Sequence, residues 1–164
     1  MKIIKSHSCK KLSKQSKLPL SYDIGHQSKQ FFFRISSNEG GIFSSEWIAW
    51  KDIQKAISAG EVFNAIKLNE LYKSSSSNNG GFLCAILTSE SLVEQIEDSE
   101  RLHMLVSDAC FKKEMNALVK AKTDLPDIVA EHEKKKAAAM AKRKNQLESA
   151  RKKNSTKTAK KAKA

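Results

Sequence analysis

The chain has 164 residues, of which 40% are hydrophobic and 29% charged, and its formal net charge at pH 7 is +12. This length accommodates one modest domain with extensions, and the composition is too apolar for disorder throughout. No apolar run reaches the roughly 18 residues of a membrane-spanning helix or forms the core of a signal peptide. The three cysteines are widely spaced, which favours a reducing compartment over a disulfide framework.

The positive charge is concentrated at the two ends of the chain. Residues 1–19 contain six lysines and no acid, and residues 134–164 contain 13 Lys+Arg against the single acid Glu148. The interval 20–133 has 11 basic and 17 acidic residues, a net charge of −6. We therefore expect four regions: a basic flexible arm over 1–19, a globular domain over 20–123, a basic helix over 124–153 and a disordered Lys-rich tail over 154–164.

The clearest strand pattern lies at residues 30–36, where apolar and polar side chains alternate and place Phe32 and Arg34 together on the second face. Turn-forming residues follow at 37–41, and a second apolar stretch covers 42–48. This order predicts a β-hairpin. A helix beginning within the second stretch is the alternative, because its serines and the following glutamate also fit a helix N-terminus.

Helical spacing of apolar residues predicts helices within 50–73, interrupted at residues 58–60, and over 89–96 and 99–120. The continuous apolar run at 82–87 favours a buried strand, with a short buried helix as the alternative. The predicted fold class is α+β. A small N-terminal hairpin or sheet packs on helices, and a basic C-terminal helix projects from this body.

The basic residues of the C-terminal helix come as three triplets about eight residues apart, with almost no acid between them. A solvated charge run is the simplest interpretation of such a helix, but solubilising helices usually mix the two signs. The helix lacks the apolar face of a membrane-surface helix, and lysines in its seam oppose a stable coiled coil. The predicted phosphate contacts are Lys134, Lys135, Lys136, Lys142, Arg143, Lys144, Arg151, Lys152 and Lys153 in the helix, and Lys10, Lys11 and Arg34 before it.

The aromatic residues of the hairpin allow two interpretations. Phe32, beside Arg34, could stack on unpaired bases, but aromatic side chains more often form the core of a small domain. No hydrolase, nucleotide-binding or metal-ligand motif occurs; His103 and Cys110 share helical spacing, but two ligands do not make a site. We therefore expect no catalytic residues, no metal and no cofactor.

These patterns predict a non-enzymatic nucleic-acid-binding accessory protein, cytoplasmic or nucleoid-associated, with no membrane partner. It would grip the phosphate backbone of DNA or RNA with low sequence specificity through its basic ends. The alternative is an adaptor or inhibitor that binds a protein partner through residues 20–133 and whose basic tail meets an acidic patch on that partner.

Overall fold

The computed structural model describes residues 1–13, 18–39, 41–73, 76–97, 99 and 101–161, with side chains in the C-terminal helix described up to residue 144. The chain forms two compact units, Met1–Pro126 and Asp127–Ala164. The first unit combines two antiparallel sheets with helices, so the predicted α+β class is confirmed. The boundaries differ from the prediction, because the first unit starts at Met1 and extends to Pro126.

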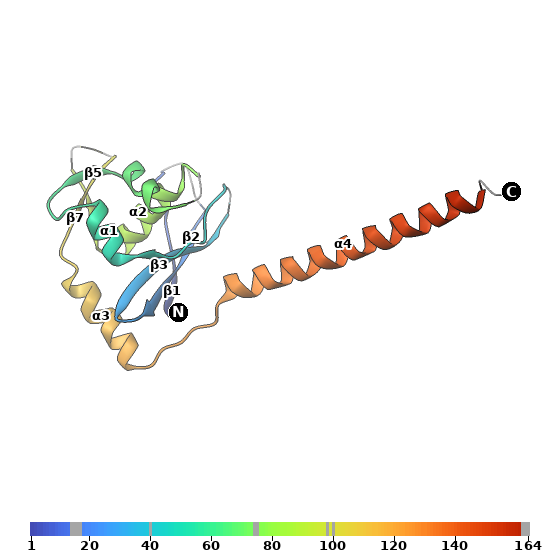
Figure 1. Cartoon of the computed structure of the whole chain (residues 1–164). Helices are drawn as coiled ribbons and strands as arrows, with labels where there is room; N and C mark the ends of the chain where they lie inside the picture. Colours follow the sequence, from blue (N-terminus) through green and yellow to red (C-terminus); the bar gives the residue numbers. More distant parts are fainter. Residues whose placement is uncertain (14–17, 40, 74–75, 98, 100, 162–164) are drawn as a thin grey trace. The chain divides into compact units, whose positions relative to one another are not determined.

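The main sheet of the first unit has four antiparallel strands in the order β1-β2-β3-β4 (Figure 1). They are β1 (Lys2–Cys9), β2 (Leu20–Gln27), β3 (Gln30–Asn38) and β4 (Ile48–Ala49). The turn between β2 and β3 consists of Ser28 and Lys29, whose φ angles are 50° and 62°. Two residues with positive φ match the right-handed twist of the flanking strands and fix their register.

Strand β3 confirms the alternation predicted at residues 30–36. The predicted pairing of this strand with residues 42–48 is largely wrong. β3 pairs along its length with β2, and the stretch 42–48 contributes only Ile48 to the short strand β4. Residues 42–47 form neither strand nor helix. The tight turn at Ser28 and Lys29 places β2 beside β3, whereas the loop is held elsewhere by a hydrogen bond from the Ser44 backbone N–H to Asn79 Oδ1 at 3.0 Å.

The prediction of a flexible arm over 1–19 is wrong for its first half. Residues Lys2–Cys9 form β1, which pairs with β2 along its length except for a bulge between Ile3 and Lys5. Ile3 and Ile4 are each only 2% exposed, and burial of two isoleucine side chains offsets the entropy of ordering a lysine-rich strand. Leu125 donates a backbone hydrogen bond of 2.8 Å to the Ile3 carbonyl, which covers part of the outer edge of β1. Residues 14–17 lie outside the described part of the chain.

The rest of the first unit alternates short strands and helices. Its second sheet has the order β5-β7-β6. The elements in chain order are α1 (Trp50–Ala56), β5 (Val62–Asn64), the 3₁₀ helix η1 (Ala65–Leu71), α2 (Asn79–Ser89), β6 (Val93–Gln95), β7 (Leu102–Leu105) and α3 (Ala109–Lys120).

Several local predictions in this part are corrected. The first helix of the 50–73 interval is confirmed as α1, but its second half is β5 followed by a 3₁₀ helix. The run at 82–87 lies in helix α2, not in a strand. A helix buried on all sides has no polar face, so its sequence resembles a buried strand.

The helices predicted over 89–96 and 99–120 are also revised. Ser91 adopts a φ of 54°, and the Leu92 N–H bonds the Leu87 carbonyl at 2.9 Å, an arrangement that terminates α2. The chain then enters β6, which pairs with β7, so only the second half of the predicted long helix is helical, as α3. Strand pairing between these two segments overrides their helical spacing.

The core lies between one face of the four-stranded sheet and the helices (Figure 1). Four aromatic rings from three elements meet there, because Phe111 of α3 lies 5.6 Å from both Phe31 and Phe33 and 6.1 Å from Trp50 between ring centroids. This confirms the core interpretation for Phe31, Phe33 and Trp50, since large rings supply much of the buried apolar area of a small domain.

The second unit is one helix, α4 (Ile128–Lys161), which Figure 1 shows as uninterrupted. Asp127 caps it, since its Oδ1 accepts a hydrogen bond of 2.9 Å from the Ala130 N–H. The predicted basic helix is therefore present, and it continues past residue 153 into the segment expected to be disordered. The lysines and Ala159 of that segment are good helix formers, whereas Asn154, Ser155, Thr156 and Thr158 are not. Residues 162–164 lie outside the described part of the chain.

Candidate nucleic-acid interface

Helix α4 concentrates the positive charge of the chain. The second unit holds 13 Lys+Arg and four acids, a net charge of +9. Every side chain from residue 131 to residue 144 is exposed, including the triplets 134–136 and 142–144. The helix has no buried face over this interval, so its backbone order does not come from packing in a core.

Helical geometry aligns two pairs of residues from the two described triplets along α4, while each triplet itself spans about 200° around the helix axis. Lys135 and Lys142 are seven residues apart, as are Lys136 and Arg143, and seven residues are close to two turns or about 10.5 Å of rise. Two acids, Glu131 and Glu133, lie near the N-terminal end, where they complement the helix dipole. The third predicted triplet, 151–153, lies within α4, where only the backbone is described.

The two lysines predicted at the start of the chain differ in their surroundings. Lys10 is exposed just after β1. Lys11 is half-buried, because its Nζ donates a hydrogen bond of 2.9 Å to the Glu39 carbonyl and lies 5.8 Å from the centroid of the Phe82 ring. Lys11 therefore anchors the segment after β1, and Lys10 is the more accessible of the pair.

Arg34 does not lie on an open surface as the alternation suggested. Its side chain is 4% exposed and pairs with Asp23, which lies opposite it in the β2–β3 register. The guanidinium also stacks under Trp47, with Cζ 4.4 Å from the ring centroid. Trp47 folds over the second face of the sheet, where Phe32 is half-buried. Because Asp23 and Trp47 enclose the guanidinium, we expect Arg34 to stabilise the sheet and not to contact phosphate.

The charge of the first unit also differs from the expected acidic domain. Because β1 belongs to this unit, its lysines count with it, and Met1–Pro126 holds 17 Lys+Arg and 14 Asp+Glu for a net charge of +3. The value of −6 for residues 20–133 therefore belongs to a stretch of sequence and not to a folded unit. Repulsion of a polyanion by the body is weaker than the sequence implied.

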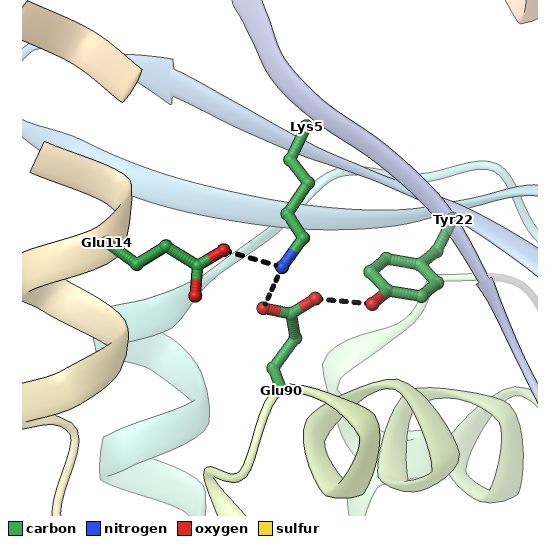
Figure 2. Close-up of polar contacts among 4 residues, drawn as sticks. All are labelled: Lys5, Tyr22, Glu90 and Glu114. Carbon is green, nitrogen blue, oxygen red and sulfur yellow. Dashed lines mark hydrogen bonds and ion pairs between the residues drawn. The ribbon is translucent and has the colours of Figure 1, made fainter. Parts of the chain in front are cut away.

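A partly buried polar cluster connects the sheet to the C-terminal end of α2 and to the middle of α3 (Figure 2). Lys5 Nζ lies 2.9 Å from Glu90 Oε2 and 3.0 Å from Glu114 Oε1, while the Tyr22 hydroxyl donates to Glu90 Oε1. Burial lowers the pKa of Lys5, but the bonds to both carboxylates outweigh it and raise the pKa overall. Burial and the bond to Glu90 raise the pKa of Tyr22.

This cluster has a structural role. Each of its members is already paired. Burial raises the pKa of the neighbouring Cys9 thiol to about 11, so this thiol stays protonated and weakly nucleophilic at neutral pH. Lys5 and Glu114 are 109 positions apart in the sequence. Periodicity reports only local structure, so no sequence pattern could have found the cluster.

Within the described part of the chain, no three His, Cys, Asp or Glu side chains are grouped so that they could hold a metal ion. His103 and Cys110, which helical spacing had placed on one face, lie in different elements, β7 and α3. No described helix is both long and apolar enough to cross a membrane.

Comparisons of the chain with protein-family models, with curated proteins and with solved structures found no significant match.

Proposed function

We propose that this protein is a non-enzymatic nucleic-acid-binding accessory protein that grips the phosphate backbone through α4. The observation that carries the proposal is a 34-residue helix whose unit has a net charge of +9 and whose described side chains are exposed from residue 131 to residue 144. A helix with no apolar face contributes little to a hydrophobic core. After Glu133, all charged residues of α4 are basic except Glu148.

The physical basis is release of counterions from nucleic acid. Each Lys or Arg that neutralises a phosphate releases condensed cations, so affinity depends steeply on salt. Lysines contact phosphates without reading base edges, which predicts low sequence specificity. DNA and RNA both satisfy this chemistry, and a cytoplasmic or nucleoid-associated location would follow from it.

The test compares full-length variants that lose the same charge. In the α4 variant, Lys142, Arg143 and Lys144 become glutamine, which keeps helix propensity. In the control variant, the exposed Lys51, Lys55 and Lys73 of the body become glutamine. Affinity for a short labelled duplex is measured over a salt series by fluorescence anisotropy.

We expect the α4 variant to bind more weakly and its salt slope to decrease by up to about 0.9 for each phosphate that the variant no longer neutralises. The control variant should lose much less affinity, because general charge acts only weakly at a distance in salt. Equal behaviour of the two variants would reject α4 as the binding element.

An adaptor function is the second candidate, and one observation favours it. The outer face of the small sheet exposes apolar side chains, with Val62 48% and Leu102 37% exposed, and Ile66 of η1 is 69% exposed. Phe63 and His103 point to the inner, buried face of the same strands. An adaptor should keep a protein partner after nuclease treatment and lose it when Val62 and Leu102 are both changed to aspartate.

A further inference from the structure

Helix α3 has a solvent-facing side that carries positive charge and is distinct from α4. Its buried side is formed by Phe111 and Met115. Lys113 and Lys120 lie on the opposite side of the helix, seven residues apart, which corresponds to about 10.5 Å of rise. Only small or polar residues accompany them on that side, and both lysines are exposed. The outer surface of α3 is therefore basic and without bulky obstruction.

The acid within α3 and the acid at its N-cap are both paired with cations outside this surface. Glu114 pairs with Lys5 at 3.0 Å on one flank of α3. On the other flank, at the start of the helix, Asp108 pairs with Lys112 at 2.8 Å and accepts a hydrogen bond of 2.9 Å from Trp50 Nε1. Both carboxylates therefore already have a cationic partner that is not one of the lysines on the outer surface.

A third lysine extends the surface beyond the helix. Lys122 lies in the turn after α3 with a φ of 56°, and its backbone N–H bonds the Val119 carbonyl at 3.0 Å. Among the described residues, Lys113, Lys120 and Lys122 make no ion pair within 4.0 Å. Asp124 is the next acid along the chain and is exposed. We call Lys113, Lys120 and Lys122 the α3 ridge.

We propose that the α3 ridge is a second phosphate-backbone contact and that it binds a nucleic-acid duplex. Proteins that bind single strands combine basic grooves with aromatic side chains on which bases stack. The outer side of α3 has no aromatic residue, and Ala109 and Ala117 leave room for a rigid backbone to approach. Its chemistry therefore fits the outside of a duplex, where phosphates are presented in fixed positions.

This inference rests on the proposed nucleic-acid function, because it assigns the body a share of the same ligand. It adds a rigid contact on the first unit, which has a net charge of +3, to the contact through α4. Two basic elements on one chain raise the local concentration of the second once the first has bound.

The experiment adds one full-length protein to the series above, in which Lys113, Lys120 and Lys122 become glutamine. It loses three charges, as do the α4 variant and the control variant with Lys51, Lys55 and Lys73 replaced. Each protein is titrated with a short mixed-sequence DNA duplex, the same duplex as RNA, and a single strand of the same sequence. Because the ridge lysines are exposed and make no ion pair in the described structure, unfolding temperatures should match wild type.

The ridge variant should lose duplex affinity several-fold more than the control, and its salt slope should fall by about 2 to 3. If the ridge and control variants lose affinity equally, the ridge is rejected as a phosphate contact. The affinity of the α4 variant alone then tests the proposed nucleic-acid function. If the ridge variant binds more weakly and the α4 variant does not, α4 is rejected as the binding element and the ridge is retained as a phosphate contact. A decrease for single strands as large as for duplex would overturn the duplex assignment.

Discussion

Arg34 donates two hydrogen bonds to one carboxylate oxygen of Asp23, from Nε at 3.0 Å and from Nη2 at 2.7 Å. Ser6 donates a further bond of 2.6 Å to the other oxygen of that carboxylate. The pair joins the two central strands of the main sheet under the ring of Trp47. A buried ion pair contributes little net stability over an apolar pair, but removal of one member leaves a buried charge without compensation.

We therefore expect Arg34→Gln to lower the free energy of unfolding by about 3 kcal/mol. The double variant with Asp23→Asn should cost less than the sum of the two single variants, because it removes both charges together. Urea denaturation monitored by tryptophan fluorescence measures both. Nucleic-acid affinity of the folded Arg34→Gln protein should match wild type; weaker binding at unchanged stability would restore Arg34 as a phosphate contact.

Two adjacent glycines in α2 should respond in opposite directions to alanine. A Cβ on Gly80 would lie 2.4 Å from the Ala65 carbonyl oxygen and 2.9 Å from the Asn69 backbone nitrogen, both in η1. Gly80→Ala should therefore destabilise the protein by about 1–3 kcal/mol through overpacking.

A Cβ on Gly81 meets nothing within 4 Å. Gly81→Ala should raise stability by about 0.5–1 kcal/mol, because alanine loses less backbone entropy in a helix. Thermal unfolding of both variants checks the pair. Equal changes in unfolding temperature would argue against the close approach of α2 to η1.

Stability should fall as the pH decreases below about 6.5 because of His103. This side chain is 2% exposed, and its Nδ1 has no hydrogen-bond partner in the described structure. Burial lowers its pKa from 6.5, so the unfolded chain binds the proton more readily than the folded chain. The contribution of the neutral ring is complete above the unfolded pKa and is lost as the pH falls toward the folded pKa.

The measurement is the free energy of unfolding from about pH 7 to about pH 5. His103→Leu should flatten the curve over the upper part of this range, whereas His132→Gln on exposed α4 should leave it unchanged. A wild-type curve as flat as that of His103→Leu would mean that the ring is accommodated in its protonated form.

The cap of α4 should control its helicity. Asp127→Ala removes the hydrogen bond to the Ala130 N–H and should weaken the helix by about 1 kcal/mol. Because α4 has no core face over its described side chains, this destabilisation should appear as reduced helicity in far-UV circular dichroism. Asp124→Ala is the matched control, since Asp124 makes no side-chain hydrogen bond within the described residues. Equal spectra for the two variants would contradict the capping role.

Local sequence features predicted some elements well and others poorly. The alternation at β3 and the helix starting at Trp50 were correct, since a half-buried strand and an amphipathic helix carry their period in the sequence. The run at 82–87 was assigned to the wrong element, because burial of Leu83, Cys84, Ala85, Ile86 and Leu87 erases that period.

The basic residues of the candidate interface also differ in how far the sequence predicted them. The triplets of α4 were visible in the sequence, since clustered charge and helix propensity are local properties. The α3 ridge was not visible in the sequence. The proposed role of Lys113 and Lys120 depends on the pairing of Glu114 and Asp108 with other cations, which only the tertiary structure shows. For Arg34 the sequence did not show the surroundings either, since Asp23 and Trp47 enclose its side chain.

The sequence by itself determined the α+β class, the uneven distribution of charge and the presence of a C-terminal basic helix. These depend on composition and on short-range periodicity. The tertiary structure alone decided that Lys2–Cys9 is an ordered strand, that β3 pairs with β2, and which charged groups remain at the surface. Those outcomes depend on contacts between residues far apart in the chain, where burial and pairing outweigh local preference.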